Sequence, residues 1–177
     1  MPTPRTTDAV VYNDKIFAIG GYSNDGTSGK DYNSIDVYDI ITNTWENSIV
    51  MPINVSAHSL ASYEDYIFII SDYDDHLGKI FAYNITNDSW INYSSNFNPR
   101  RHVATIIKDE KLYSYGGNLP RSFYDPQNDS TLIKYDDLQV ANIAVENFHS
   151  VDDFNFSELF GVKPDGAIRS IAALDSY

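Results

Sequence analysis

The sequence contains no cysteine, which excludes disulfide frameworks, thiolate zinc sites and cysteine nucleophiles. Long hydrophobic runs are also missing, so no membrane-spanning helix and no membrane insertion are expected. The first five residues, MPTPR, are not followed by the apolar stretch of a signal peptide, and none is predicted in this chain. These absences remove several classes of protein before any motif is considered.

Basic residues are scarce. Twelve Lys and Arg stand against 25 Asp and Glu, which gives a net charge of −13. Nucleic acids and anionic membranes are bound by clustered Lys and Arg, so the composition argues against nucleic acid as a partner. An acidic surface is typical of a soluble chain.

The compartment stays open between cytoplasmic and secreted. Asn-x-Ser/Thr sequons are more frequent than chance predicts, and this excess favours a lumenal or extracellular protein. Asn-rich turns would explain the same excess. The six sequons begin at Asn54, Asn84, Asn87, Asn92, Asn128 and Asn155.

Aromatic and apolar residues dominate what is present. Apolar residues make up 42% of the chain, and the aromatic share of 14% is carried mainly by 14 Tyr and 9 Phe. Tyr, Phe, Ile and Val fit a half-buried pleated surface, so the composition predicts an all-β protein.

An internal repeat organises the chain. The segment YNDKIFAIGGY at 12–22 returns as YEDYIFIISDY at 63–73 and as KDEKLYSYGG at 108–117, a spacing of about 50 residues. Each copy is a two-residue acidic turn followed by a short apolar strand, which is a hairpin signal. The sequence therefore predicts three repeats of one small antiparallel unit.

The second half of the unit repeats as well. Tyr38 is followed seven residues later by Trp45, and Tyr83 is followed at the same spacing by Trp90. In the third copy we place Tyr135 at the tyrosine position, with an asparagine at the tryptophan position. Polar turns separate the members of each pair, so two further strands are expected in every repeat.

This array resembles the kelch-repeat β-propeller family over roughly residues 1–146. The resemblance implies a partial propeller of four-stranded antiparallel blades, whose ring this chain does not close alone, because propellers close with about four to eight blades. We expect further blades in a longer gene product, or a second copy, to complete the ring. The motifs that carry the resemblance are Gly20-Gly21, Gly116-Gly117, the Tyr–Trp pairs, and the Pro-x-Arg elements around Pro4-Arg5 and Pro99-Arg101.

The expected organisation follows from the repeats. Residues 1–50, 51–97 and 98–146 are predicted as blades, the third degenerate, and 147–177 as an irregular segment with the possible first strand of a fourth repeat. Ser71-Asp72 replaces the glycine pair of the second repeat, and Ser56 takes the slot of Arg5 and Arg101.

The motif residues are predicted to be structural. Gly20, Gly21, Gly116 and Gly117 would end second strands where a Cβ would clash or an unusual φ is needed. The Tyr and Trp residues, Tyr135 included, are expected to anchor neighbouring blades.

Ligand binding is predicted on the face that carries the loops between second and third strands (22–33, 73–78 and 118–130) and the linkers between blades. The acidic run around Asp74 is interpreted as a tight turn rather than a metal site. His58 and His102, at strand starts, are expected to be structural. No cofactor, metal ligand or catalytic residue is assigned, and the candidate binding residues are Tyr22, Asn24, Tyr73, Asp74, His76, Asn118 and Arg121.

The function that the resemblance implies is a protein–protein or glycan interaction module. The alternative is a fragment of a carbohydrate-active propeller enzyme, epimerase- or oxidase-like, with its catalytic residues largely outside this chain. A copper oxidase centre with a Tyr–Cys cross-link is excluded because cysteine is absent. A third interpretation is a truncated copy without function.

Overall fold

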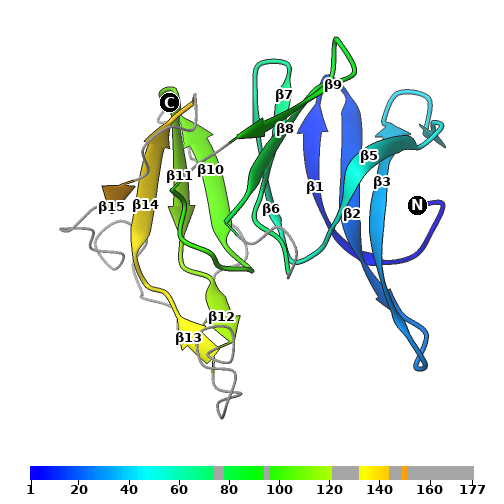
Figure 1. Ribbon diagram of the computed structural model, residues 1–177. Coiled ribbons are helices and arrows are strands. Elements are labelled where there is room, and N and C mark those ends of the chain that lie inside the picture. The colour runs from blue at the N-terminus through cyan, green and yellow to red at the C-terminus, as the bar shows by residue number, and fades with distance from the viewer. Residues whose placement is uncertain (74–77, 94–95, 121–131, 144–148, 151–177) are drawn as a thin grey trace.

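The computed structural model describes residues 1–73, 78–93, 96–120, 132–143 and 149–150 (Figure 1). Every regular element in these ranges is a β-strand. The strands form separate antiparallel sheets that stand side by side in chain order (Figure 1). The expectation of an all-β, partial propeller with blades of four strands is confirmed.

The first blade is a meander whose four strands pair in sequence order. A fifth strand, β5, pairs with β3 at Tyr32–Ile35. The strands are β1 (Thr6–Tyr12), β2 (Lys15–Asn24), β3 (Gly29–Asp39), β4 (Thr44–Trp45) and β5 (Ile49–Val55).

The second blade has the same order, β6 (Ser59–Tyr63), β7 (Tyr66–Ile70), β8 (Ile80–Asn84) and β9 (Ser89–Tyr93). The third blade has the order β10 (Ala104–Lys108), β11 (Lys111–Tyr115), β14 (Leu138–Asn142) and β15 (His149–Ser150). A separate ribbon of β12 (Asn118–Pro120) and β13 (Leu132–Lys134) is inserted between β11 and β14. Of the predicted segment 147–177, only β15 lies within the described residues.

The acidic turns between first and second strands form as predicted. Asn13 and Asp14 have φ of 45° and 59°, and Asp109 and Glu110 have φ of 51° and 57°. Two successive positive φ angles are typical of the type I′ turn, whose twist matches that of a hairpin. Short polar residues tolerate this conformation better than β-branched ones, which explains why these positions repeat in the sequence.

Pairing in the third blade corrects the predicted place of Tyr135. Strand β11 pairs with Leu138–Asn142, so that Lys111 lies opposite Asn142 just as Lys15 lies opposite Asp39 in the first blade. Ala141, not Tyr135, therefore occupies the position of Tyr38. The inserted ribbon lengthens this repeat. Its apolar pattern resembles that of β3, so the sequence alone aligns Tyr135 with Tyr38.

Blades pack through flat apolar faces. Phe17 and Val37 of the first blade share one buried cluster with Tyr83 of the second, and Trp90 packs against it, as expected for inter-blade anchors. Phe68 and Ile70, on the opposite face of the second blade, pack with Leu112 of the third.

The equivalent pair in the first blade, Tyr38 and Trp45, is turned away from the second blade, and Trp45 is 38% exposed. The two rings contact each other, with centroids 5.1 Å apart. An aromatic pair of this kind is thus buried only where another blade precedes its own.

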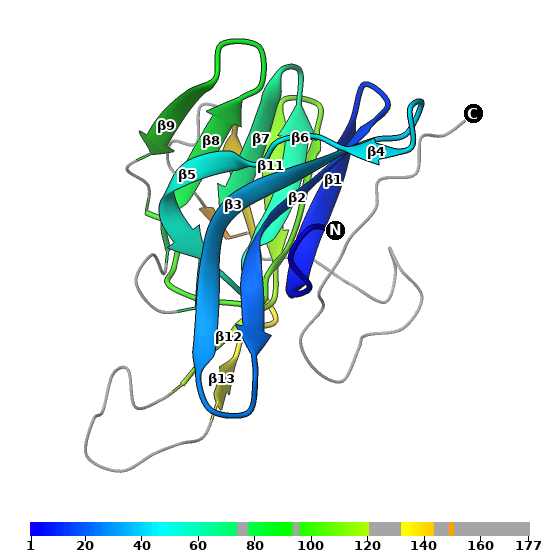
Figure 2. The ribbon, with the colours of Figure 1, turned by 90° about the vertical axis from the view of Figure 1, so that its right-hand side faces the viewer.

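The described parts of two predicted binding loops belong to β-ribbons. Residues 22–24 and 29–33 belong to β2 and β3, so that only Asp25–Ser28 form the tip of a long hairpin arm. Strands β12 and β13 form a second arm at the equivalent place. Both arms extend beyond the blades toward the bottom of the two ribbon views (Figures 1 and 2).

Candidate functional site

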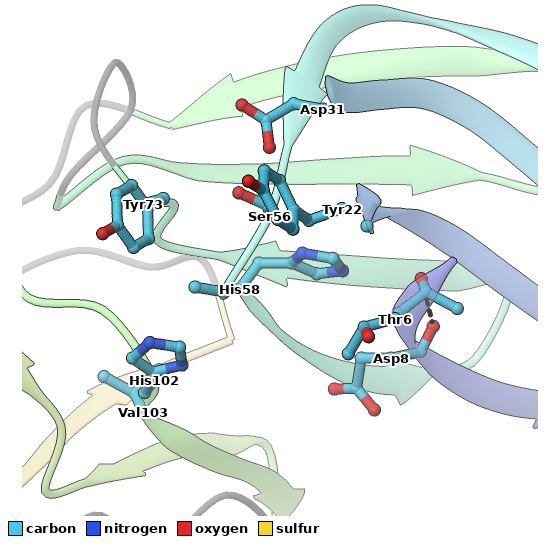
Figure 3. Close-up of a pocket in the computed structure, with 12 residues that line it drawn as sticks. Thr6, Asp8, Tyr22, Asp31, Ser56, His58, Tyr73, His102 and Val103 are labelled. Carbon is cyan, nitrogen blue, oxygen red and sulfur yellow. Dashed lines mark hydrogen bonds between the residues drawn. The ribbon is translucent and has the colours of Figure 1, made fainter. Parts of the chain in front are cut away.

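The candidate site is a pocket where the first strands of the three blades begin. Strand β6 contacts both β1 and β10, so these starts lie together. The pocket has a volume of about 610 Å³. We call it the axial pocket, and its lining residues are Thr6, Thr7, Asp8, Gly21, Tyr22, Asp31, Ser56, Ala57, His58, Tyr73, His102 and Val103 (Figure 3).

Equivalent positions of the repeat line this pocket. Thr7, His58 and Val103 each lie five residues before the residue that closes the first hairpin of their blade. The preceding positions include Ala57 and His102, whose φ angles of 51° and 55° turn the chain into the blade. The side chain that each repeat places here therefore decides the chemistry of the pocket.

His58 is a buried polar residue of the pocket. Its exposed fraction is 8%, and its ring nitrogens make no hydrogen bond of regular geometry. Burial lowers its pKa from 6.5 to about 4, against the smaller opposing effects of the Asp72 charge and the Ile19 carbonyl. Desolvation disfavours the imidazolium, so His58 is neutral at physiological pH.

Asp8 supplies a carboxylate that is partly committed to the backbone. Its side chain accepts hydrogen bonds from the amides of Ala9, at 2.9 Å, and of Leu60, at 3.2 Å. Burial raises the pKa of Asp8, and these two amide bonds oppose the rise. Because Leu60 lies in β6, Asp8 also joins the first two blades. Asp31, on the arm, is an exposed second carboxylate.

Two tyrosines form aromatic walls. Tyr22 and Tyr73 are 41% and 42% exposed. The guanidinium carbon of the buried Arg101 lies 3.8 Å from the centroid of the Tyr73 ring. In Figure 3, Tyr73 and His102 lie on one side of His58, and Thr6 and Asp8 on the other.

The glycine pair lets the strands approach closely beside the pocket. A Cβ on Gly21, whose φ is 104°, would lie 2.4 Å from the carbonyl oxygen of Thr6. Gly20, with a φ of 56°, is similarly close to Val55. Both predicted reasons for glycine, a positive φ and a clash, hold at this pair.

The second blade makes the equivalent bend after its second strand, which we call the corner, without glycine. Ser71 takes the positive φ, at 66°, and donates a side-chain hydrogen bond to the carbonyl of Arg100. Asp72 accepts a hydrogen bond from the amide of Ser56 at 2.8 Å. Side-chain hydrogen bonds to nearby backbone thus accompany the strained conformation.

A buried arginine anchors the corner in the outer two blades. Arg5 forms an ion pair of 2.7 Å with Asp36, and its guanidinium lies 5.0 Å from the ring centroid of Tyr32. In the second blade Phe81 takes the place of Asp36, and the residues before Ala57, Val55 and Ser56, are uncharged, so no charge is left alone.

In the third blade the anchor is Arg100, which corrects the prediction that Arg101 corresponds to Arg5. Arg100 pairs with Asp137 at 2.6 Å, donates to the Gly116 carbonyl at 3.1 Å and lies 4.0 Å from the centroid of Tyr135. Tyr135 therefore corresponds to Tyr32. Arg101 reaches the pocket side instead, with its Nε 3.4 Å from Oδ1 of Asn118.

The other predicted binding residues divide into three groups. Tyr22 and Tyr73 line the axial pocket. Asn24 lies at the arm tip, where its side chain contacts the Tyr22 hydroxyl at 3.2 Å, and Asn118 pairs with Arg101 at the base of the second arm. Asp74, His76 and Arg121 lie outside the described residues.

Sequence reasoning missed Asp8, Asp31 and both histidines as pocket residues. The alignment of the repeats does carry one usable signal, because His58 replaces a threonine in one copy and a valine in another. A histidine at a repeat position that is otherwise small or apolar indicates a candidate binding residue.

Within the residues that the structure covers, no group of three or more His, Asp or Glu is arranged to hold a metal ion. The same part of the chain has no helix long and apolar enough to cross a membrane.

Four-stranded antiparallel meanders that meet along their first strands define the class of β-propeller blades. A model of the kelch motif matches residues 7–47, which is most of the first blade. The resemblance to the kelch-repeat family is thereby confirmed.

Several curated proteins are similar to this chain. They are Kelch-like protein 41a of Danio rerio (26% identical over 66% of this chain and 20% of that protein), Kelch repeat and BTB domain-containing protein 8 of Homo sapiens (28% over 68% and 20%), and Kelch-like protein 7 of Mus musculus (33% over 51% and 15%). The chain spans about a fifth of the length of the first two.

Proposed function

We propose that this chain is a protein-interaction module that binds a partner with the face carrying the two arms and the axial pocket. The observation that carries the proposal is the axial pocket itself, to which all three blades contribute equivalent positions. Similarity to kelch-like proteins supports an interaction role, and it does not specify the partner.

The geometry favours a partner that reaches between the arms. The sheets hold their strand ends in fixed register, and the arms extend from second and third strands of the first and third blades on one side of the molecule (Figure 2). Recognition groups on a rigid scaffold lose little entropy on binding. A peptide segment that enters between the arms would reach Tyr22 and Tyr73 first.

The surface chemistry suits a polypeptide. Exposed tyrosines supply large contact area at low entropic cost, and they are enriched in protein interfaces. Carboxylates and histidines among them supply hydrogen-bond acceptors. A glycan would also stack on such rings, so the experiment has to include sugars.

The test is selection of binders from a random-peptide display library on the immobilised 177-residue chain, in parallel with a glycan array. We expect enriched peptides whose binding falls at least about tenfold, or about 1.4 kcal/mol, in both Tyr22→Ala and Tyr73→Ala. Ile41→Ser, a 75% exposed position in the turn at the opposite face, is the control and should bind like the unaltered chain.

Three outcomes would contradict the proposal. They are peptides that lose binding with Ile41→Ser and not with the tyrosine variants, a selection that enriches no sequence, and tight binding of a glycan alone. A carbohydrate-active enzyme stays a prediction, because its catalytic residues are expected outside this chain.

A further inference from the structure

We propose that the axial pocket receives the cationic side chain of an arginine or lysine from the partner. This inference rests on the proposed interaction function and deepens it by naming the chemical class that the pocket takes.

The first reason for this inference is the negative charge of the pocket. Among its lining residues, the charged side chains are the carboxylates of Asp8 and Asp31, and none is Lys or Arg. Outside the lining, Arg101 lies on the Tyr73 ring with its Nε close to Asn118, and Arg5 is paired with Asp36. A chain of net charge −13 adds a long-range field of the same sign. An anionic ligand would be repelled by both lining carboxylates and by the net charge of the chain.

The second step is the unsatisfied acceptor at the centre. His58 is more than nine-tenths buried and lines the pocket; the Ile19 carbonyl faces one ring nitrogen, and the other nitrogen has no hydrogen-bond partner. A neutral imidazole accepts one hydrogen bond, and buried polar groups in native proteins are almost always paired. A ligand with several N–H donors would supply the missing partner while its charge faces Asp8. Guanidinium and ammonium groups have these donors and accept none.

The third step is the aromatic lining. The faces of Tyr rings attract cations, and this attraction grows in desolvated sites. One face of Tyr73 already holds a guanidinium, that of Arg101, with 3.8 Å between the guanidinium carbon and the ring centroid. Tyr22 is 41% exposed beside Asp31, so its ring is available to a second cation. The pocket thus offers a carboxylate, a neutral acceptor and an aromatic surface to one group.

The experiment uses the whole 177-residue chain and four pentapeptides, acetyl-GGXGG-amide with X as arginine, lysine, citrulline or glutamate. Citrulline has the shape of arginine without its charge. Binding is followed by NMR through the His58 ring proton and the Gly21 amide. We expect the arginine peptide to bind at least about tenfold more tightly than the citrulline peptide, with lysine between them and no shift from glutamate.

Asp31→Asn tests the charge at an exposed position, where folding is least affected. It should weaken arginine binding by about two- to fivefold, as for a partly exposed ion pair, and leave citrulline binding unchanged. Glu64→Gln removes the same charge from a turn at the opposite end of the second blade and is the matched control. A third variant, His58→Phe, should weaken the arginine peptide and the citrulline peptide alike, because both donate N–H groups.

Equal binding of arginine and citrulline, tighter binding of glutamate, or no shift at His58 with any peptide would overturn the inference. So would equal effects of Asp31→Asn and Glu64→Gln. Its failure is distinguishable from failure of the proposed function, because library peptides that depend on Tyr22 and Tyr73 but contain no Arg or Lys would sustain the interaction role alone.

Discussion

Tyr12, the last residue of β1, donates its phenolic proton to Asp65 in the first turn of the next blade. The same relationship recurs one blade later, where burial, the charges of Glu110 and Glu64, and a hydrogen bond to Glu110 raise the pKa of Tyr63. The acidic turn of each repeat thus has a second role beyond turn formation, because it receives the tyrosine of the preceding blade. Asp14, at the equivalent position of the first blade, has no preceding blade in this chain.

Asp65→Asn should therefore destabilise the chain more than Asp14→Asn. The bonds from Tyr12 and Thr86 lower the pKa of Asp65 below 3.8, so its contribution is present above pH 3.8 and is lost as the pH falls below it. Thermal unfolding at pH 7 and at pH 3 measures this difference. Equal melting temperatures for the two variants at pH 7 would show that the inter-blade bond adds no stability.

His58 should make stability depend on pH in a weakly acidic window. Its pKa of about 4 lies below the ordinary 6.5, so the unfolded chain binds more protons between these values and stability falls as the pH decreases. The expected loss between pH 7.5 and pH 5 is on the order of 2 kcal/mol. Urea unfolding at both pH values measures it.

In His58→Phe this pH dependence should shrink by most of that amount. The control is His102→Asn, which keeps a residue tolerant of the positive φ of 55° and leaves His58 in place. An unchanged pH dependence in the phenylalanine variant would mean that other groups titrate in this window.

Gly21→Ala should destabilise the fold by roughly 2 kcal/mol or more, because a positive φ is combined with a close backbone contact. Its Cβ would lie 2.4 Å from the Thr6 carbonyl oxygen. Gly26→Ala is the matched control, since Gly26 has a comparable φ of 91° with no atom within 4 Å of the added Cβ. Chemical denaturation compares the two, and an equal cost would assign the whole effect to φ.

Arg100→Met should cost on the order of 3 kcal/mol, because the side chain is fully buried and its loss removes the ion pair with Asp137 and the hydrogen bond to the Gly116 carbonyl. Lys30→Met, which removes an exposed cation beside Tyr32, should cost less than about 0.5 kcal/mol. Asp137→Asn should lower the free energy of unfolding less in the Arg100→Met background than in the unaltered chain. Additive costs in this cycle would show that the two side chains are not coupled.

The inter-blade role of Tyr83 and Trp90 and the glycine corners could be predicted from sequence, because each depends on a local motif at fixed spacing. The assignments of Tyr135 and Arg101 were wrong because an inserted ribbon and two adjacent arginines each offer two plausible alignments. Only strand pairing and the ion pair with Asp137 distinguish these alignments. The predicted binding residues belong to the loops between second and third strands, and they do not include His58, which lies just before the first strand of its blade.

The sequence alone determined that this chain is a set of repeated four-stranded units, since turn chemistry, glycine pairs and alternating apolar residues act over a few neighbours. The tertiary structure decided where its binding chemistry lies. Asp8, His58 and His102 are about 50 residues apart along the chain and meet only because the first strands of successive blades pack around one centre. Packing between repeats depends on the side chains at the contacting faces of the blades. The sequence pattern within one repeat does not show which residues of different blades these contacts bring together.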